Sequence, residues 1–455
     1  MTGRDILLAA LRNESTPRAP WVPFVGVHGG KMIGESAGAY LQSSDLIVRG
    51  LTRACERYRP DGLPIVFDLQ LEAEVLGCGM HWSEQTPPSV TSHPLANAKL
   101  SDLPPFDPSR GRFPIVIEAQ QTMKQRIGRE VGLYGLVTGP FTLALHLMGT
   151  NIFLEMFNDP AGVKSVLDFC AAVGCKAADA YLDAGADVIA LVDPMTSQIS
   201  PAHFAEFVAD YANRVFDHIH ARGALTSLFV CGNATRNLEA MCRTRADNLS
   251  VDENIDFARL RDLARAEGKS FGGNLKLTTV LLLGSPDAAK LDAIRCLDIG
   301  GTRGFVLAPG CDLPYATPEA NLEAVATTVH DPYQREIARA TAHVDATAFD
   351  DVNLPDYDKE PRVIVDVVTL DSASCAPCQY MVGAVQDAAR SLGDRVVIRE
   401  HKITTKDGLG HMAKLGVGQI PTICIDGQVT FPSLIPDIPT LTDAIRKRLE
   451  TKGNS

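Results

Sequence analysis

The stretch "LTSLFVCGN" (225–233) is a mostly apolar run that stops at Cys231 and then breaks at glycine and Asn233. A run of this length and composition predicts a β-strand that is buried on both faces, as strands are in a parallel sheet. A buried cysteine is ordinary in any core. A thiol at the carboxyl end of a parallel strand, however, lies where such sheets bind ligands.

Seven further runs share this pattern, and each of the eight is followed by at least one segment of helical periodicity. The runs are 22–28, 64–69, 132–139, 187–193, 225–231, 248–252, 270–274 and 303–310. Eight such units predict an α/β fold, a (β/α)8 TIM barrel. The alternative is an open doubly wound sheet. No GxGxxG opens a helix after the first run, so the sequence does not indicate dinucleotide binding.

Polar residues or thiols follow most of the predicted strands. Because active sites of such barrels lie at the carboxyl ends of the strands, these residues are candidates for binding substrate, cofactor or metal. They are His28, Asp68, Asp193, Cys231, Asp252, Asn274 and Cys311, with Asn233 beside Cys231. The alternative for each polar residue is a helix cap or a turn, and Cys231 and Cys311 would alternatively be small core residues. If both thiols reach one barrel mouth, they predict a site for a soft or borderline metal, zinc by default.

Composition predicts a protein with a large core in a reducing compartment. The 455 residues are 45% hydrophobic and 22% charged, with a net charge of −12, which argues against a nucleic-acid partner. We find no apolar run of membrane-spanning length and no signal peptide, so we expect a cytoplasmic protein. Eleven cysteines should then be mostly reduced.

A second domain is expected after an acidic linker. The stretch "DDVNLPDYDKEP" (350–361) holds two prolines and few apolar residues. We therefore expect a barrel over residues 1–345, a linker over 346–361 and a small α/β domain over 362–455. The last of these shows the order βαβαββα, with "CAPC" (375–378) after its first strand. That pattern resembles thioredoxin.

The CAPC motif predicts redox chemistry. A helix N-terminus stabilises a thiolate, so Cys375 should be the nucleophile and Cys378, one turn along, should resolve a mixed disulfide. A zinc site here would need a second ligand pair, but the domain adds only Cys424 and two histidines that the sequence does not pair. The resemblance also covers Ile420-Pro421-Thr422, which matches the family's cis-proline segment. In that family this proline, here Pro421, lets the adjacent backbone bind the partner thiol or peptide.

Residues 1–335 resemble the uroporphyrinogen decarboxylase superfamily. The motifs are "RAPWVPFVGVHGG", "YRPDGLPIVFDLQLEAEVLG", "VTGPFTLALHLMG", "CGN" and "LAPGCDLPYATPEAN". Decarboxylases carry an arginine pair near the N-terminus that binds propionates, whereas this chain has "VGVHGGKMIGESAGAY" there. The chain therefore looks like the methyltransferase branch, which moves methyl groups between a corrinoid protein and a thiol such as coenzyme M.

The resemblance implies a zinc site with one departure. The methyltransferases bind zinc through His-x-Cys and a distant Cys, and Cys231 and Cys311 match the two cysteines, whereas the histidine position is Phe229. Asp193, Asp252, His28 or the substrate thiol would complete the site. A thiophilic metal such as Cu(I), or no metal, is the alternative.

The implied activity is corrinoid-dependent methyl transfer to or from a small thiol. Asp68 matches a pocket aspartate of the superfamily and would orient the substrate, while Glu74 is expected to face solvent. No DxHxxG corrinoid motif is present, so the corrinoid would arrive free or on a partner protein. The alternative function is a metal- or thiol-handling protein built on this barrel, without methyl transfer. The sequence does not indicate an oligomeric state.

Overall fold

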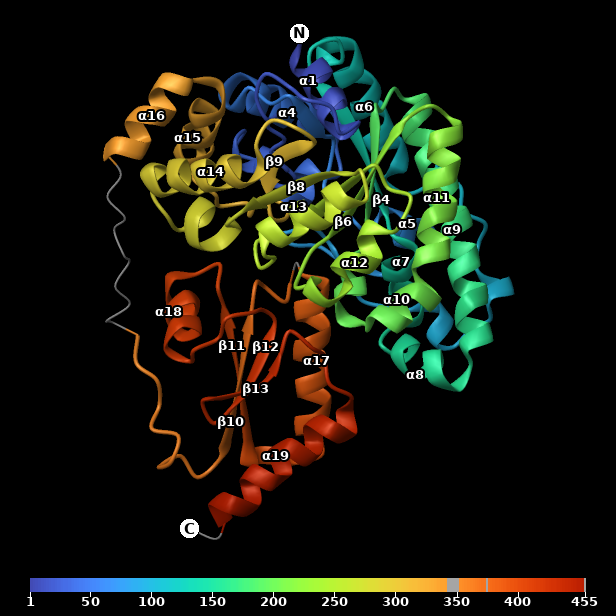
Figure 1. The fold of residues 1–455 in the computed structure, drawn as a ribbon. Coiled ribbons are helices and arrows are strands. Elements are labelled where there is room, and N and C mark those ends of the chain that lie inside the picture. The colour runs from blue at the N-terminus through green and yellow to red at the C-terminus, as the bar shows by residue number, and fades with distance from the viewer. Residues whose placement is uncertain (342–351, 374, 454–455) are drawn as a thin grey trace. The chain divides into compact units, whose positions relative to one another are not determined.

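The computed structural model describes residues 1–341, 352–373 and 375–453. The chain divides into two compact units, Met1–Val344 and Asp345–Ser455 (Figure 1). Residues 346–351 of the expected linker lie outside the described residues. Residues 352–361 belong to the second unit, where the Tyr357 hydroxyl donates a hydrogen bond to Asp366 Oδ2 at 2.8 Å.

The first unit is built on a curled, fully parallel sheet. Within the described residues its strand order is β1-β4-β5-β6-β7-β8-β9. The strands are β1 (Gly62–Pro64), β4 (Gly132–Thr138), β5 (Val188–Val192), β6 (Leu225–Val230), β7 (Asn248–Val251), β8 (Ser270–Leu275) and β9 (Phe305–Pro309). Each strand lies beside the next one along the chain, as a barrel requires. A short hairpin, β2 (Met80–His81) with β3 (Ser89–Val90), lies outside this sheet.

The first expected strand, 22–28, is not a regular strand. The chain is extended through residue 24, and residue 28 already begins helix α2 (His28–Lys31). Pro20 and Pro23 have no backbone N–H, so a continuous ladder cannot form. The segment still occupies the place of an eighth strand: Val22 N donates to Leu307 O at 2.9 Å, and Asp61 N and Gly62 N donate to Trp21 O at 2.8 Å and 3.4 Å. These bonds join the two edge strands β9 and β1 and support the TIM-like barrel.

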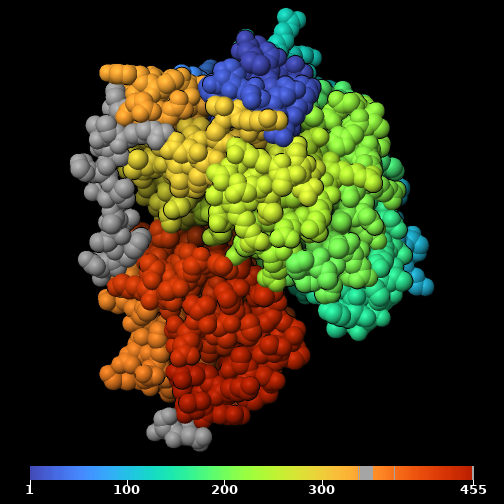
Figure 2. Space-filling model, in the orientation of Figure 1, coloured from blue at the N-terminus to red at the C-terminus, as the bar shows by residue number. Residues whose placement is uncertain are grey.

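Helices surround this sheet (Figure 1). They are α1 (Gly3–Leu11), α2, α3 (Ala37–Tyr40), α4 (Ser44–Tyr58), α5 (Leu71–Val75), α6 (Phe113–Ile127), α7 (Pro140–Met148), α8 (Asn151–Asn158), α9 (Pro160–Asp183), α10 (Pro201–Phe207), α11 (Ala209–Ala221), α12 (Leu238–Cys242), α13 (Phe257–Ala266), α14 (Pro286–Gly300), α15 (Glu319–His330) and α16 (Pro332–Thr341). Ser-Pro pairs begin α10 and α14, where the serine hydroxyl accepts from the first turn and proline suits the first helical position. Figure 2 shows the blue N-terminal end of the chain beside the gold segment near residue 303, where Ser15 and Arg303 form an isolated bridge.

The barrel interior is apolar and aromatic. Side chains from alternate strand positions fill it, among them Leu136, Val192, Phe229 and Ala308, with Phe24 from the extended segment. Cys231 and Cys311 pack against this cluster at its edge. Because side chains alternate along a strand, Cys231, which directly follows β6 and lies two positions after Phe229, points into the same space. This alternation positions Cys231.

The second unit has its own four-stranded sheet in the described residues, in the order β11-β10-β12-β13. The strands are β10 (Val363–Thr369), β11 (Val396–Lys402), β12 (Thr422–Ile425) and β13 (Gln428–Pro432), with helices α17 (Ala376–Arg390), α18 (Lys406–Lys414) and α19 (Ile438–Gly453). Strands β10 and β11 are parallel, and the other two pairs are antiparallel. Valines of β10 pack with Met381, Ile423 and Leu441 in a separate core.

Candidate active site

The structure brings Cys231 and Cys311 together at one end of the barrel. Cys231 follows β6 directly, and Cys311 comes two residues after the end of β9. Their Sγ atoms are 2.9 Å apart and both residues are half-buried. A pair of thiols 80 residues apart in sequence therefore faces the same small space, which gives the barrel mouth two soft donor atoms.

Asp252 is the carboxylate most closely tied to this pair. Its Oδ2 accepts a hydrogen bond from Gly232 N at 3.0 Å, and its Oδ1 accepts from Asn254 N at 2.9 Å. Burial raises the pKa of Asp252. No third His, Cys, Asp or Glu ligand atom lies within 4.8 Å of both thiols among the described residues. A metal there would need Asp252 to swing away from Gly232, or a donor from the substrate.

His28 and Asp193 use their polar atoms elsewhere. His28 Nε2 lies 2.7 Å from the Tyr58 hydroxyl and its Nδ1 lies 3.2 Å from Tyr315 O, and burial lowers the pKa of His28 to about 4. Asp193 accepts from Thr142 N at 2.8 Å and Thr142 Oγ1 at 2.6 Å, and burial raises its pKa to about 6. Phe141 N donates to the other oxygen at 3.2 Å. Asp193 therefore accepts hydrogen bonds from the first turn of α7. This is the helix-capping role that the sequence left as the alternative to a binding role.

Asp68 lies in a buried ion-pair cluster that the sequence did not indicate. Arg112 bridges two carboxylates: its Nη1 pairs with Asp68, and its Nε donates to Glu74 at 2.7 Å. The guanidinium also stacks over Trp82, with its carbon 4.8 Å from the ring centroid. Arg112 Nη2 is buried without a hydrogen-bond partner in the described part of the chain. Glu74 was expected to face solvent; that prediction is wrong, because Arg112 draws it inward.

Glu72, on α5, is a buried carboxyl that contacts Thr138, the last residue of β4. Its Oε1 accepts from Thr138 N at 3.1 Å, and its Oε2 lies 2.6 Å from Thr138 Oγ1. Thr138 Oγ1 also lies 2.9 Å from Leu69 O, yet a hydroxyl has only one proton to donate. Both contacts are satisfied when Glu72 is protonated and donates to Thr138. Burial raises the pKa of Glu72 to about 7, in agreement with this count.

The two candidate asparagines hold loops in place. Asn233 Oδ1 accepts from Thr235 N at 3.1 Å and from Thr235 Oγ1 at 2.6 Å, a local turn. Asn274 is buried and donates to Ile255 O at 3.0 Å and to Asp252 O at 3.3 Å. Asn274 thus fixes the loop that carries Asp252.

Asp312 is a further site residue that the sequence analysis missed. It follows Cys311 directly, which was the available signal, and burial raises its pKa well above the ordinary value. Its Oδ1 is buried without a partner among the described residues. Gly26, whose φ is +41°, leaves space for this carboxyl. A Cβ atom at residue 26 would lie only 1.9 Å from Asp312 Oδ1, so a larger residue would collide with it.

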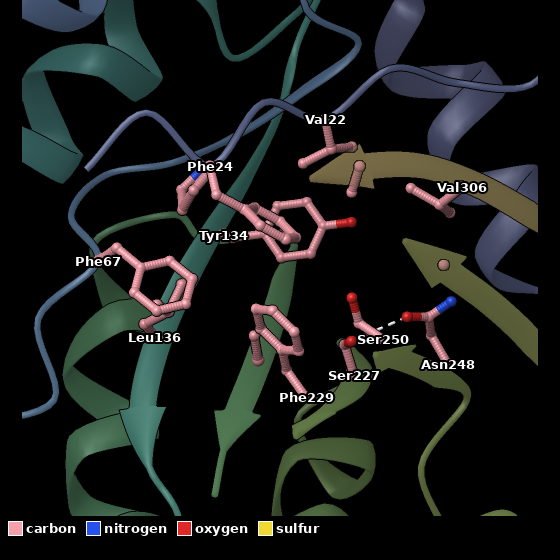
Figure 3. A pocket seen from close by; sticks show the side chains of 14 residues that line it. Val22, Phe24, Phe67, Tyr134, Leu136, Ser227, Phe229, Asn248, Ser250 and Val306 are labelled. Atoms are coloured by element: carbon pink, nitrogen blue, oxygen red, sulfur yellow. Dashed lines mark hydrogen bonds between the residues drawn. The ribbon is translucent and has the colours of Figure 1, made fainter. Parts of the chain in front are cut away.

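Phe229, two residues before Cys231 in sequence, lines a pocket inside the barrel (Figure 3). Its ring centroid is 5.1 Å from that of Phe24 and 5.7 Å from that of Phe67. The same pocket is also lined by the polar side chains of Ser227, Asn248 and Ser250 (Figure 3). Ser227 Oγ donates to Asn248 Oδ1 at 2.9 Å, whereas Ser250 Oγ has no partner in the described residues. Phe229 is therefore part of an aromatic cluster and supplies no ligand.

The CAPC motif begins α17 in the second unit. Cys375 is the N-cap residue and is half-buried, while Cys378 is fully buried. Cys378 N donates to Cys375 Sγ at 3.4 Å, and Leu370 N donates to Cys378 Sγ at 3.3 Å. The Ile420–Pro421 peptide bond is cis. Cys375 thus has the helix amides and the exposure that a nucleophilic thiol needs.

Residues 2–332 match the family described as Uroporphyrinogen decarboxylase (URO-D). The chain belongs to this family. A methylcobamide:CoM methyltransferase, MtbA, of Methanosarcina acetivorans is 29% identical over 71% of this chain and 96% of its own length. MtaA of Methanosarcina barkeri (strain Fusaro), also named a methylcobamide:CoM methyltransferase, is 30% identical over 62% of this chain and 83% of its own length. A uroporphyrinogen decarboxylase of Synechococcus is 26% identical over 70% of this chain and 94% of its own length.

The barrel of this family member also matches a solved structure. A methyltransferase from Methanosarcina mazei superposes with a TM-score of 0.68 and 26% identity, covering 73% of this chain and 99% of that one. This match confirms the TIM-like barrel. The family match ends at residue 332, so it does not include the second unit. None of the helices in the described residues is both long and apolar enough to cross a membrane.

Proposed function

We propose that this family member is a corrinoid-dependent methyltransferase that moves a methyl group between a corrinoid, free or on a partner protein, and a small thiol. The observation that carries the proposal is the approach of Cys231 and Cys311 to 2.9 Å at the carboxyl ends of β6 and β9. The similarity to proteins named methylcobamide:CoM methyltransferase over most of their length supports it. For transfer from the corrinoid to the thiol, the thiolate sulfur would attack the methyl carbon, and the electron pair of the breaking carbon–cobalt bond would stay on cobalt.

Cys231 and Cys311 are the proposed metal ligands. Two thiols at an open barrel mouth suit zinc, which, when bound, stabilises a substrate thiolate at neutral pH. Of the three candidates named for a further ligand, only Asp252 adjoins the Cys231 turn. His28 and Asp193 are held by other partners.

Asp68 and Arg112 are the proposed substrate-orienting pair. Asp68 holds the guanidinium of Arg112 in place, and the buried Nη2 of Arg112 keeps an unused N–H group. A guanidinium fixed in this way can donate to an anionic or carbonyl group of a substrate. Asp68 would then act by positioning Arg112.

The second unit is the proposed thioredoxin-like redox domain. Its strand order, the N-cap position of Cys375 and the segment around Pro421 support this assignment. Cys375 would attack a disulfide, and Cys378 would release it as two thiols, so that CAPC becomes a disulfide. Its target is either the disulfide form of the acceptor thiol or an oxidised Cys231–Cys311 pair.

Methyl transfer is tested with the full-length chain, methylcobalamin and 2-mercaptoethanesulfonate, by following the absorbance of methylcobalamin. We expect thiol-dependent loss of methylcobalamin that Cys231→Ser and Cys311→Ser abolish. Cys175→Ser is the matched control, because Cys175 is a half-buried thiol of α9 outside the site. Stoichiometric zinc without turnover, with free or protein-bound corrinoid, would instead favour a metal- or thiol-handling protein.

The redox assignment is tested by thiol counting after reduction and mild oxidation. The wild-type chain should lose two more thiols than Cys378→Ser, because only the wild type can close the CAPC disulfide. Equal losses in the two proteins would remove the redox role.

A further inference from the structure

Three metal-binding side chains meet in the second unit, away from CAPC in sequence. His401 is the penultimate residue of β11, and Asp407 and His411 stand one helical turn apart on α18. One ligand atom from each of the three lies within 4.8 Å of the others. The rings of the two histidines stack, with centroids 4.0 Å apart and planes at 14°. Because the nitrogen lone pairs lie in the ring planes, one ring has to turn about its side-chain bonds for both to reach one ion.

A buried carboxylate orients the first of these histidines. Asp366 on β10 is fully buried, and its Oδ1 lies 2.7 Å from His401 Nε2. Asp366 is itself held by the Tyr357 hydroxyl on its other oxygen. Because Nε2 is engaged, Nδ1 of His401 is the nitrogen left for a ligand. A carboxylate behind an imidazole is the arrangement that metal-binding histidines usually show.

The other two side chains combine access with a fixed spacing. His411 Nδ1 lies 2.9 Å from Asp407 O and 3.4 Å from Asp407 Oδ2, and Asp407 is exposed. A carboxylate and an imidazole four residues apart on a helix face the same side. The neighbouring cation Lys402 is engaged by Asp371 at 2.7 Å. An ion could therefore enter from solvent on the Asp407 side.

We propose that His401, Asp407 and His411 bind a divalent transition-metal ion of the zinc class, which joins helix α18 to strand β11. Two imidazoles and one carboxylate suit zinc and its neighbours better than magnesium or calcium. Three protein ligands leave a coordination position for water or another small ligand. This site is independent of the barrel thiols and of the proposed methyl transfer.

Zinc titration of the full-length chain in a Cys231→Ser/Cys311→Ser background tests the site by calorimetry, with CAPC oxidised so that its thiols do not bind the ion. We expect one equivalent of zinc that His411→Gln and Asp407→Asn each remove. Asp387→Asn, on α17, is the matched control, because Asp387 is a helix carboxylate whose ion-pair partner is Arg390. Asp366→Asn should keep the equivalent but weaken its affinity about 10- to 100-fold.

Two results would overturn the proposal: no saturable zinc binding in the background protein, or equal binding in the His411→Gln and Asp407→Asn variants. A second measurement guards against loss of fold. In the Cys231→Ser/Cys311→Ser background with CAPC oxidised, zinc should raise the melting temperature of the protein and of its Asp387→Asn variant, whereas the His411→Gln variant should melt cooperatively at a temperature that zinc does not change.

Discussion

Phe229 shows how one residue can change a site while keeping the fold. Its ring closes an aromatic cluster with Phe24 and Phe67 at the position where the resemblance implies a histidine ligand. A phenylalanine there packs without needing a hydrogen bond, whereas an imidazole brings two nitrogens into the pocket wall. Ser250 Oγ, which lines the same pocket without a partner, is the available acceptor for one of them.

We therefore expect Phe229→His to raise zinc occupancy and lower stability. The stability loss should be about 1–3 kcal/mol, because a polar ring replaces a buried aromatic one. Zinc is measured in protein purified without chelator, and stability by urea unfolding. Phe67→His is the matched control, since it places an imidazole in the same cluster without adding a ligand at the implied position. A gain in zinc that survives Cys311→Ser would contradict a shared site.

Glu72 predicts a pH dependence of folding. Its folded pKa of about 7 lies above the ordinary value of 4.5, so below pH 4.5 both the folded and unfolded states hold the proton. Between pH 4.5 and 7 only the folded state keeps it, and stability falls as pH rises. The fall from this group is about 3 kcal/mol. Glu72→Gln can still donate to Thr138, so its stability should exceed that of the wild type increasingly across this window. The free energy of unfolding is measured by urea unfolding at several pH values. A constant difference between the two proteins from pH 4.5 to 7 would contradict a protonated Glu72.

At the scale of elements, Arg112 joins two helices that the sequence leaves separate. It precedes α6, and its partners Asp68 and Glu74 lie before and within α5. The chain between these helices thus places the guanidinium of Arg112 beside the buried carboxylate of Asp68. The extended segment at residues 20–24 has a similar role, because it closes the barrel through hydrogen bonds to β9 and toward β1 instead of through a regular ladder.

Arg112→Ala should destabilise the barrel unit by about 3–5 kcal/mol, because it leaves Asp68 buried without a cation. Chemical unfolding measures the change. Arg110→Ala is the control: its side chain is 67% exposed, and its loss should change stability by less than about 0.5 kcal/mol. Adding Asp68→Asn to Arg112→Ala should recover part of the loss. If the double variant is as unstable as the sum of the single variants, the ion pair is not the cause.

At the scale of the whole molecule, each unit has its own apolar core. The barrel core includes Val192 and Phe229, and the second core includes Val365 and Ile423. Separate cores predict separate cooperative unfolding transitions.

We expect calorimetry of the full-length chain to show two transitions. Leu249→Ala, in β7, should lower the temperature of one of them, and Ile423→Ala, in β12, the other. Each substitution removes a fully buried side chain and should cost about 2–5 kcal/mol in its own unit. A single transition that both substitutions shift equally would show that the units unfold together.

From the sequence alone we predicted parallel strands that pair in chain order, a second unit after an acidic stretch, and two thiols at strand ends. These features follow from short-range patterns: apolar runs make buried strands, and consecutive parallel strands place their carboxyl ends at one edge of a sheet. The CAPC motif at a helix start was predicted in the same way, whereas the thioredoxin-like assignment stays a prediction.

Only the tertiary structure decided which side chains meet. Arg112 reaches Asp68 across 44 positions, and His401 meets a turn of α18. Asp193 and His28 were equal candidates in sequence until the packing of Thr142 and Tyr58 engaged their polar atoms. The physical reason is that a buried polar group must find a partner wherever packing brings one close, and local propensity carries no information about that partner.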